Sequence, residues 1–408
     1  MRSLELFAGA GGLAIGTARA GFDHRAVIEW DHDACETLRR NANAGAGHKD
    51  DWEVVEGDVR SYNFRQHQGD IQFISGGPPC QPFSLGGKHR GFLDDRNMFP
   101  EAARSVREIQ PKAFIFENVK GLLRRNFANY YNYTILRLRF PDVVPKGDEE
   151  WTDHLARLEK LSTGGKHKGL RYNVVYRLVD AADYGVPQHR SRVVIVGVRS
   201  DLGIEFSFPD SSHEEATLLH DQWVSGDYWE RHRVARKDRP TMPAKVRAKV
   251  ERLNSLCTAL MLRPWRTVRD AICDLPTLTG GESRPSVADH FLNPGARSYA
   301  GHTGSPLDEP AKALKAGDHG VPGGENTLRL PDGSVRYFSV RECARIQTFP
   351  DEWRFAGSWT ESMRQLGNAV PVLLAETVAT RLYETLTRAE QVAERLRLAA
   401  AMYPRLRS

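Results

Sequence analysis

Residues 4–13 of the 408-residue chain read LELFAGAGGL, and this stretch decides the fold. An apolar run beginning at Leu4 is typical of a buried strand, and the glycines at Gly9, Gly11 and Gly12 precede a helical pattern. A strand, a glycine-rich turn and a helix in this order let backbone N–H groups approach a cofactor closely. The stretch therefore predicts the first strand of an α/β domain that binds an adenosine-bearing molecule.

Short apolar segments alternate with helical stretches through the N-terminal half, which favours a doubly wound, mostly parallel sheet with helices on both faces. This alternation stops near Pro209, where Arg, Lys, Pro and Trp become frequent, so we expect a second, smaller domain. A helix over residues 375–398 should pack back on the first domain, whereas residues 122–169 form an irregular insertion by their pattern. The expected strands span residues 4–7, 26–29, 53–56, 71–75, 113–117, 174–179 and 193–198, and the domains span 1–208 plus 365–408 and 209–364.

Composition adds weaker constraints. The formal charge of +5 is compatible with a polyanionic partner, although many proteins that bind no nucleic acid are as basic. The five cysteines are scattered without zinc-ligand spacing, which predicts a reducing cytoplasm and no structural metal. A strand beginning near Met1 leaves no room for a signal peptide, and no apolar run approaches membrane-spanning length. We expect a cytoplasmic protein that contacts no membrane.

Acidic residues end the second and third predicted strands. Glu29, about 20 residues beyond the turn, is placed to accept hydrogen bonds from ribose hydroxyls, as in dinucleotide folds. Asp58 could bind an adenine amino group. The pattern Gly9-x-Gly11-x-x-Ala14 also satisfies the nicotinamide dinucleotide fingerprint, and a glycine turn can serve packing alone. The loop does not by itself identify the cofactor.

Residues 74–84, ISGGPPCQPFS, place Cys80 just past the carboxyl end of the fourth strand, where ligands bind in open α/β sheets. Two prolines fix the backbone before the cysteine, and two glycines permit close approach of a substrate. The alternative is a buried, inert cysteine. We interpret Cys80 as a nucleophile, because a structural cysteine needs none of these features.

The next strand ends in Glu117, and the fourth and fifth strands of a doubly wound sheet are neighbours about 5 Å apart. Cys80 and Glu117 should therefore face one cleft. Burial beside a thiol would raise the pKa of this carboxyl, so that it can donate a proton near neutral pH. A structural salt bridge is the alternative role for Glu117.

Attack on an electron-poor ring suits this pair. Carbon 5 of cytosine is too weak a nucleophile to be methylated directly, but thiolate addition at carbon 6, with protonation at N3, makes carbon 5 enamine-like. Carbon 5 can then attack a sulfonium methyl group, and loss of its proton with elimination of the thiol regenerates the enzyme. The covalent step explains why the motif contains sulfur.

Taken together, the chain resembles the DNA cytosine-5 methyltransferase family, whose motifs it matches in order along nearly its whole length. One departure is Met98, where leucine is common. The motifs are FAGAGG at 7–12, PPC at 78–80, ENV at 117–119, QHRSR at 188–192, RECARIQTFP at 341–350 and GNAVP at 367–371.

The resemblance implies a Rossmann-like methyltransferase fold with a smaller target-recognition domain, and transfer of methyl from S-adenosyl-L-methionine, giving S-adenosyl-L-homocysteine, to a flipped-out cytosine of double-stranded DNA. It implies that Glu117 contacts cytosine N3, that Arg192 holds the cytosine O2 and that Arg190 supports the catalytic loop, although both arginines could instead be surface charges. The 341–350 stretch looks structural in the family. By the same resemblance the cofactor contacts are Phe7, Gly9, Gly11, Gly12, Leu13, Glu29, Trp30, Asp58, Val59, Pro78, Met98, Asn368 and Val370, with Trp30 either stacking on adenine or filling the core.

DNA contact is expected from two segments. Residues 83–97 are glycine-rich and basic, as in a mobile loop that closes over phosphates, or are a flexible surface loop. The basic run over residues 231–249 falls where the family places its recognition domain, and phosphate contact is favoured over base reading, with a solvated helix face as the alternative.

Three competing interpretations are weaker. A tRNA cytosine-5 methyltransferase shares the catalytic set, but its Cys-Phe-Thr signature is absent. A non-catalytic DNA-binding regulator would not need Cys80, Glu117, Arg190, Arg192 and Asn368 together. An NAD oxidoreductase leaves the motif around Cys80 unexplained. We expect a monomeric enzyme of the bacterial restriction-modification or phage-defence type, acting beside a cognate restriction or defence system.

Overall fold

A seven-stranded sheet with the order β3-β2-β1-β4-β5-β7-β6 forms the centre of the molecule. The computed structural model describes residues 1–42, 52–79, 97–165, 167–255, 262–278, 287–298, 303–316 and 326–402. The first five strands are parallel, and β7 runs antiparallel to both of its neighbours. The predicted mostly parallel α/β sheet is confirmed, and each predicted segment is a strand: β1 (Arg2–Leu6), β2 (Asp23–Glu29), β3 (Glu53–Glu56), β4 (Phe73–Gly76), β5 (Ala113–Val119), β6 (Tyr172–Asp180) and β7 (Ser191–Arg199).

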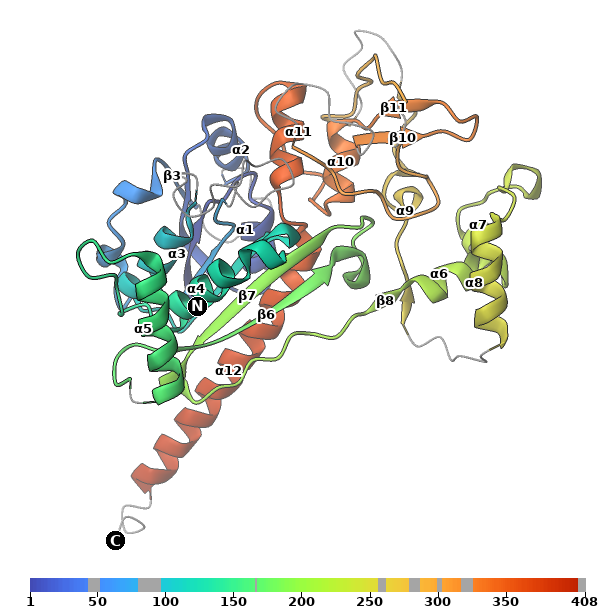
Figure 1. Ribbon diagram of the computed structural model, residues 1–408. Helices are drawn as coiled ribbons and strands as arrows, with labels where there is room; N and C mark the ends of the chain where they lie inside the picture. The colour runs from blue at the N-terminus through green and yellow to red at the C-terminus, as the bar shows by residue number, and fades with distance from the viewer. Residues whose placement is uncertain are drawn as a thin grey trace.

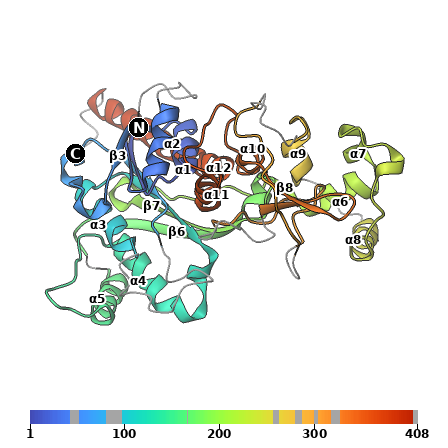
Figure 2. The same cartoon turned by 90° about the horizontal axis from the view of Figure 1, so that it is seen from above.

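Helices cover both faces of this sheet (Figures 1 and 2). On one face, α3 (Phe99–Ile109) and α4 (Ala128–Arg139) pack on strand side chains that include Ile74 and Phe114. On the other, α12 (Val372–Met402) packs on side chains that include Ile115. The helix α1 (Gly12–Arg19) lies against α12 so closely that a Cβ on Gly16 would come within 2.5 Å of the Ala375 Cβ, and α2 (His32–Ala42) lies beside β3. The prediction that the C-terminal helix packs on the first domain is confirmed.

The expectation of an irregular insertion over residues 122–169 is wrong. The segment holds the 3₁₀ turn η5 (Arg125–Phe127) and the helices α4 and α5 (Trp151–Gly164), after η4 (Lys120–Leu123). Tyrosines supply part of the buried face of α4, beside Ile135, Leu136 and Leu138. The Tyr133 hydroxyl meets the Nδ1 of buried His154 on α5 at 2.8 Å. Tyrosine and histidine hide the apolar periodicity, because their polar tips bond to each other while their rings pack.

A separate group of helices lies to one side of the sheet (Figures 1 and 2). We call it the small lobe, and define it as residues 213–255 and 262–267. Its core is built from Leu218, Tyr228 and Trp229. Its elements are β8 (His213–Glu214), α6 (Glu215–Trp223), α7 (Asp227–Arg231), η8 (Arg236–Asp238), α8 (Ala244–Ser255) and β9 (Arg263–Pro264).

The rest of the C-terminal half packs on the first domain through an apolar cluster that joins Phe349 and Trp353 to Ala14 and Leu38. The domain boundaries at 208–209 and 364–365 stay a prediction. No helix of the described residues is long and apolar enough to cross a membrane. Among the described residues of this half, the further elements are α9 (Val268–Ile272), β10 (Thr327–Arg329), β11 (Val335–Tyr337), α10 (Val340–Ile346) and α11 (Trp359–Asn368). Other 3₁₀ turns in the described part of the chain are η1 (Val59–Ser61), η2 (Phe64–His67), η6 (Ala181–Tyr184) and η7 (Ser200–Leu202).

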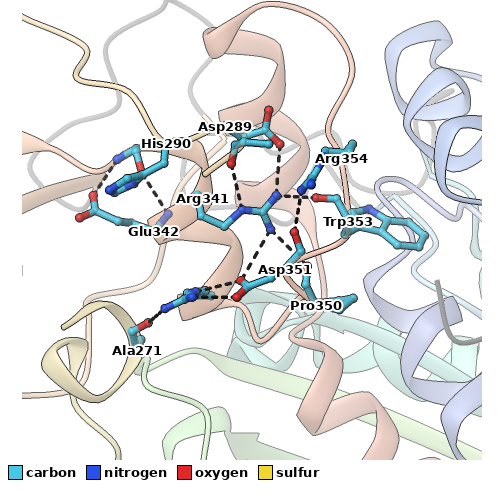
Figure 3. A network of polar contacts seen from close by, with 12 residues as sticks. Ala271, Asp289, His290, Arg341, Glu342, Pro350, Asp351, Trp353 and Arg354 are labelled. Carbon is cyan, nitrogen blue, oxygen red and sulfur yellow. Dashed lines mark hydrogen bonds and ion pairs between the residues drawn. The ribbon is translucent and has the colours of Figure 1, made fainter. Parts of the chain in front are cut away.

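Arg341 on α10 is fully buried and ties together the segments around it (Figure 3). Its guanidinium donates to the carbonyl oxygens of Trp353 at 2.7 Å and of Pro350 at 3.2 Å. It also pairs with the Asp289 carboxylate at 3.3 Å. This arrangement supports the structural role expected for the 341–350 stretch.

We expect Arg341→Met to lower the free energy of unfolding by about 3–5 kcal/mol, because it leaves a carboxylate and several carbonyl groups without their buried cation. Urea unfolding followed by circular dichroism measures the change. Arg25→Met is the control, since Arg25 is exposed and pairs with Asp23 at the surface. Equal stability of the two variants would contradict the role assigned to Arg341.

Candidate active site

The turn after β1 is held by Glu29, which ends β2. One carboxylate oxygen accepts from the Gly9 N–H at 2.7 Å, and the other accepts from the N–H groups of Trp30 and Asp31, each at 2.9 Å. Burial raises the pKa of Glu29 despite these three donors. The predicted ribose acceptor thus also fixes the shape of the glycine turn, a role that the sequence did not indicate.

The glycines of the turn differ in the space around them. A Cβ on Gly12 would come within 2.2 Å of the Val370 carbonyl oxygen, and one on Gly11 within 2.9 Å of Leu38. Gly9 has a φ of +51°, and no atom lies within 4 Å of where its Cβ would be. The packing role weighed as an alternative therefore holds for Gly11 and Gly12, whereas Gly9 faces open space.

Gly12→Ala should lower the free energy of unfolding by about 1–3 kcal/mol, since the added methyl group forces α1 away from the Val370 backbone. Thermal and urea unfolding measure this loss. Gly57→Ala is the matched control, because a Cβ there meets no atom within 4 Å. A Gly12 variant as stable as the Gly57 variant would show that the contact can relax freely.

Further predicted cofactor residues lie just after β2, just before η1 and at or beyond the end of α11. Trp30 is 72% exposed, so the alternative that it fills the core is wrong. The Asp58 carboxylate is engaged by the Arg60 guanidinium at 2.5 Å, which lowers the pKa of Asp58. Asn368 is exposed at the end of α11, and Val370 is buried against Leu13.

Cys80 lies outside the described residues, as do residues 83–96 of the predicted mobile loop. The chain that leads to the cysteine is held on both sides. The Asn118 side chain donates to the Pro78 carbonyl at 2.9 Å, and the Met98 N–H donates to the Pro79 carbonyl at 3.1 Å. The two prolines thus follow β4 in a fixed path at the carboxyl edge of the sheet.

Glu117 lies beside this path, on β5. A Cβ on Gly77 would be 3.5 Å from its Oε2, and Gly76 pairs with Phe116 across β4 and β5, as the expected strand order requires. The Arg192 guanidinium forms an ion pair with Glu117 at 2.5 Å. Burial raises the pKa of Glu117, and the two nearby arginines offset this only in part. The salt bridge weighed as an alternative is present, together with the raised pKa expected of a proton donor.

Arg190 is 1% exposed and connects two motifs that lie far apart in the sequence. It donates to the Leu314 carbonyl at 2.8 Å and to the Gly367 carbonyl at 2.6 Å. The alternative of a surface charge is wrong for Arg190, and for Arg192, whose side chain is 12% exposed. The sequence pattern missed Asp180, which accepts from the Arg190 N–H at 3.0 Å.

Comparison with known proteins agrees with this geometry. The family described as C-5 cytosine-specific DNA methylase matches residues 1–140 and 158–384. Type II methyltransferase M.NgoMIV of Neisseria gonorrhoeae is 32% identical over 391 residues, which cover 94% of this chain and 97% of that protein. Type II methyltransferase M.Eco47II of Escherichia coli is 34% identical over 379 residues, covering 92% and 77%. The chain belongs to the C-5 cytosine-specific DNA methylase family.

Solved structures show the same fold at lower identity. The S. pombe Dnmt2 methyltransferase aligns with a TM-score of 0.53 and 18% identity, over 95% of this chain and 99% of that one. The Entamoeba histolytica methyltransferase EhMeth aligns with a TM-score of 0.54 and 14% identity, over 95% and 98%. The α/β methyltransferase fold predicted from the sequence is confirmed. The family match and the Type II relatives confirm the predicted class of enzyme.

Proposed function

We propose that the chain transfers a methyl group from S-adenosyl-L-methionine to carbon 5 of a cytosine flipped out of double-stranded DNA, through a covalent bond between Cys80 and carbon 6. The observation that carries this proposal is the buried Glu117–Arg192 pair beside the Pro78–Pro79 path that leads to Cys80. Addition of a thiolate to a pyrimidine ring requires a nearby proton donor with a raised pKa. Glu117 is such a donor, beside the segment that leads to the Cys80 thiol.

The described residues fit the cofactor. Gly9 leaves open space at the turn, and the exposed Trp30 ring offers a stacking surface for adenine. The Glu29 oxygen that accepts only from the Gly9 N–H keeps one lone pair for a ribose hydroxyl, and when bound the cofactor supplies an electrophilic methyl group. The proposed contacts are those predicted from the sequence: Phe7, Gly9, Gly11, Gly12, Leu13, Glu29, Trp30, Asp58, Val59, Pro78, Met98, Asn368 and Val370.

The residues of the chain then act in sequence. The Cys80 thiolate adds to carbon 6 while Glu117 gives its proton to N3, and Arg192 binds the O2 on the same ring edge. Carbon 5 becomes the nucleophile and takes the methyl group. A base removes the carbon 5 proton, the bond from sulfur to carbon 6 breaks, and the proton on N3 returns to Glu117. Arg190 acts at a distance by holding the Gly367 and Leu314 backbone.

The small lobe is proposed to hold the DNA as part of a recognition domain over residues 209–364. Exposed cations on it, among them Arg233, Arg236, Lys245 and Arg247, suit phosphate contacts. Flipping the cytosine out of the base stack costs about 2–4 kcal/mol, and the phosphate contacts must offset this cost. The names of the Type II relatives support a role as the modification component of a restriction-modification system. A phage-defence role and action as a monomer stay predictions.

Bisulfite sequencing tests this function. Plasmid DNA from a host that lacks cytosine methylation and expresses this chain should show protected cytosines at one short motif. Unprotected DNA with soluble protein present would favour the RNA substrate or the regulator instead. The biological role needs a separate test: it fails if the neighbouring genes encode no nuclease or defence component and deletion leaves phage sensitivity unchanged.

A further inference from the structure

The small lobe meets the catalytic sheet at the turn η6, which connects β6 to the 188–192 motif. The Ser212 N–H donates to the Asp183 carbonyl at 2.9 Å, and the Trp265 indole N–H donates to the Asp183 carboxylate at 3.0 Å. The His213 ring lies so close to Gly185 that a Cβ there would be 2.6 Å away. The lobe therefore rests on a few residues at one corner of the sheet, where β8 enters the lobe (Figure 1).

Trp265 contacts residues on both sides of the junction between the small lobe and the catalytic sheet. One side of its ring packs on the lobe core of Leu218, Tyr228 and Trp229. It also meets the His189 ring edge to face, with centroids 4.7 Å apart and planes at 83°. A movement of the lobe core must therefore move the surroundings of His189.

His189 lies between the small lobe and the two arginines of the proposed site, Arg190 and Arg192. Its Nδ1 lies 3.3 Å from one oxygen of the Asp180 carboxylate, and the other oxygen accepts from the Arg190 N–H at 3.0 Å. Arg190 in turn holds the Gly367 carbonyl, and Arg192, two residues further along in β7, pairs with Glu117. A short series of contacts therefore connects the small lobe to Glu117, the proposed proton donor.

A second attachment holds the lobe independently of this path. The Tyr228 hydroxyl donates to the Asp308 carboxylate at 2.8 Å, and Gln222 donates to the Asp308 carbonyl at 2.7 Å. Arg269 on α9 pairs with the same carboxylate at 2.6 Å. The lobe should stay attached when the Trp265 contact to η6 is weakened.

We propose that Trp265, seated on Asp183 and His189, is a positioning residue that couples the placement of the small lobe on DNA to the alignment of Arg190 and Arg192 with Glu117. This inference rests on the proposed function, in which the lobe binds DNA. The lobe reaches its working position only when DNA is bound correctly, and Trp265 transmits that position through His189 and Asp180. Catalysis is thereby tied to productive DNA binding without Trp265 touching the base.

The test is Trp265→Phe, which keeps an aromatic ring in the lobe core and removes the indole N–H. Single-turnover methyl transfer to unmethylated plasmid DNA should fall about five- to tenfold, the effect of one lost hydrogen bond acting on alignment. The Kd for the same DNA and the melting temperature should stay at wild-type values. Trp223→Phe is the matched control, since Trp223 packs on Trp229 in the same core.

A second pair of variants separates positioning from packing. Asp183→Asn keeps an oxygen that accepts the indole N–H and should transfer methyl at close to the wild-type rate, whereas Asp183→Ala should be as slow as Trp265→Phe. A wild-type rate of methyl transfer by Trp265→Phe would overturn the inference. A slower rate that Trp223→Phe also shows, in proportion to a lowered melting temperature, would overturn it as well. Methylation by the wild-type chain, measured in the same experiment, decides the proposed function separately.

Discussion

Cys80→Ala is expected to abolish methyl transfer to DNA, with a loss of about 10⁴-fold or more, and to leave cofactor binding unchanged. Without the thiolate, carbon 5 of cytosine stays too weak a nucleophile to attack the methyl group. The cofactor contacts proposed above do not include residue 80, so alanine there removes none of them. Transfer of labelled methyl to plasmid DNA measures the first effect, and isothermal titration with S-adenosyl-L-homocysteine measures the second.

The covalent bond itself can be trapped. Fluorine on carbon 5 cannot leave as a proton does, so the wild-type enzyme should stay joined to DNA that contains 5-fluorocytosine, and Cys80→Ala should not. Cys273→Ala is the control, because Cys273 is an exposed cysteine of the C-terminal half. Retained methylation by Cys80→Ala, or an adduct that forms without this sulfur, would overturn the mechanism.

The mostly parallel sheet and the neighbouring positions of β4 and β5 were predictable, whereas the antiparallel place of β7 between β5 and β6 was not. Apolar runs separated by helical patterns give parallel strands, and the right-handed crossovers between them place β5 beside β4. The neighbouring positions of Gly76 and Phe116 then follow, so that the sequence alone predicts Glu117 beside the path to Cys80. Trp30 could not be decided in this way, because an aromatic residue after a strand suits either a core or a cofactor.

The partners of Arg190 could not be predicted. They are the backbone carbonyls of Leu314 and Gly367, which have no side-chain pattern that marks them as acceptors. The helices of the 122–169 segment were missed for a related reason, since three of the buried residues of α4 are tyrosines, which weaken the aliphatic pattern of this helix. The contact of Trp265 with His189 joins residues that only the folded chain brings together.

Glu117→Gln should lower the rate of methyl transfer by about 10²–10⁴-fold, the usual contribution of a positioned proton donor. Glutamine has nearly the same shape and can donate a hydrogen bond, but it cannot release a proton to N3. The pKa of Glu117 is raised by burial, so the wild-type rate should fall as pH rises through that pKa and the carboxyl loses its proton. The same deprotonation should lower stability, since above the unfolded pKa the folded state binds more protons than the unfolded chain. The rate of the glutamine variant should lack this alkaline decline.

Glu5→Gln provides a control with the same substitution on another strand of the sheet, since Glu5 lies on β1 and Glu117 on β5. Glu5 is fully buried in β1, where burial raises its pKa to about 8, so its carboxyl is mostly protonated at neutral pH and an amide replaces it closely. We expect Glu5→Gln to transfer methyl within about twofold of the wild type, because an exchange of one neutral buried group for another changes little. Arg192 loses its partner in Glu117→Gln, so melting temperatures of both variants are needed beside the rates. A Glu117 variant that keeps the wild-type rate and the wild-type pH profile would show that the proton on N3 comes from elsewhere, and would reduce Glu117 to the ion pair that holds Arg192.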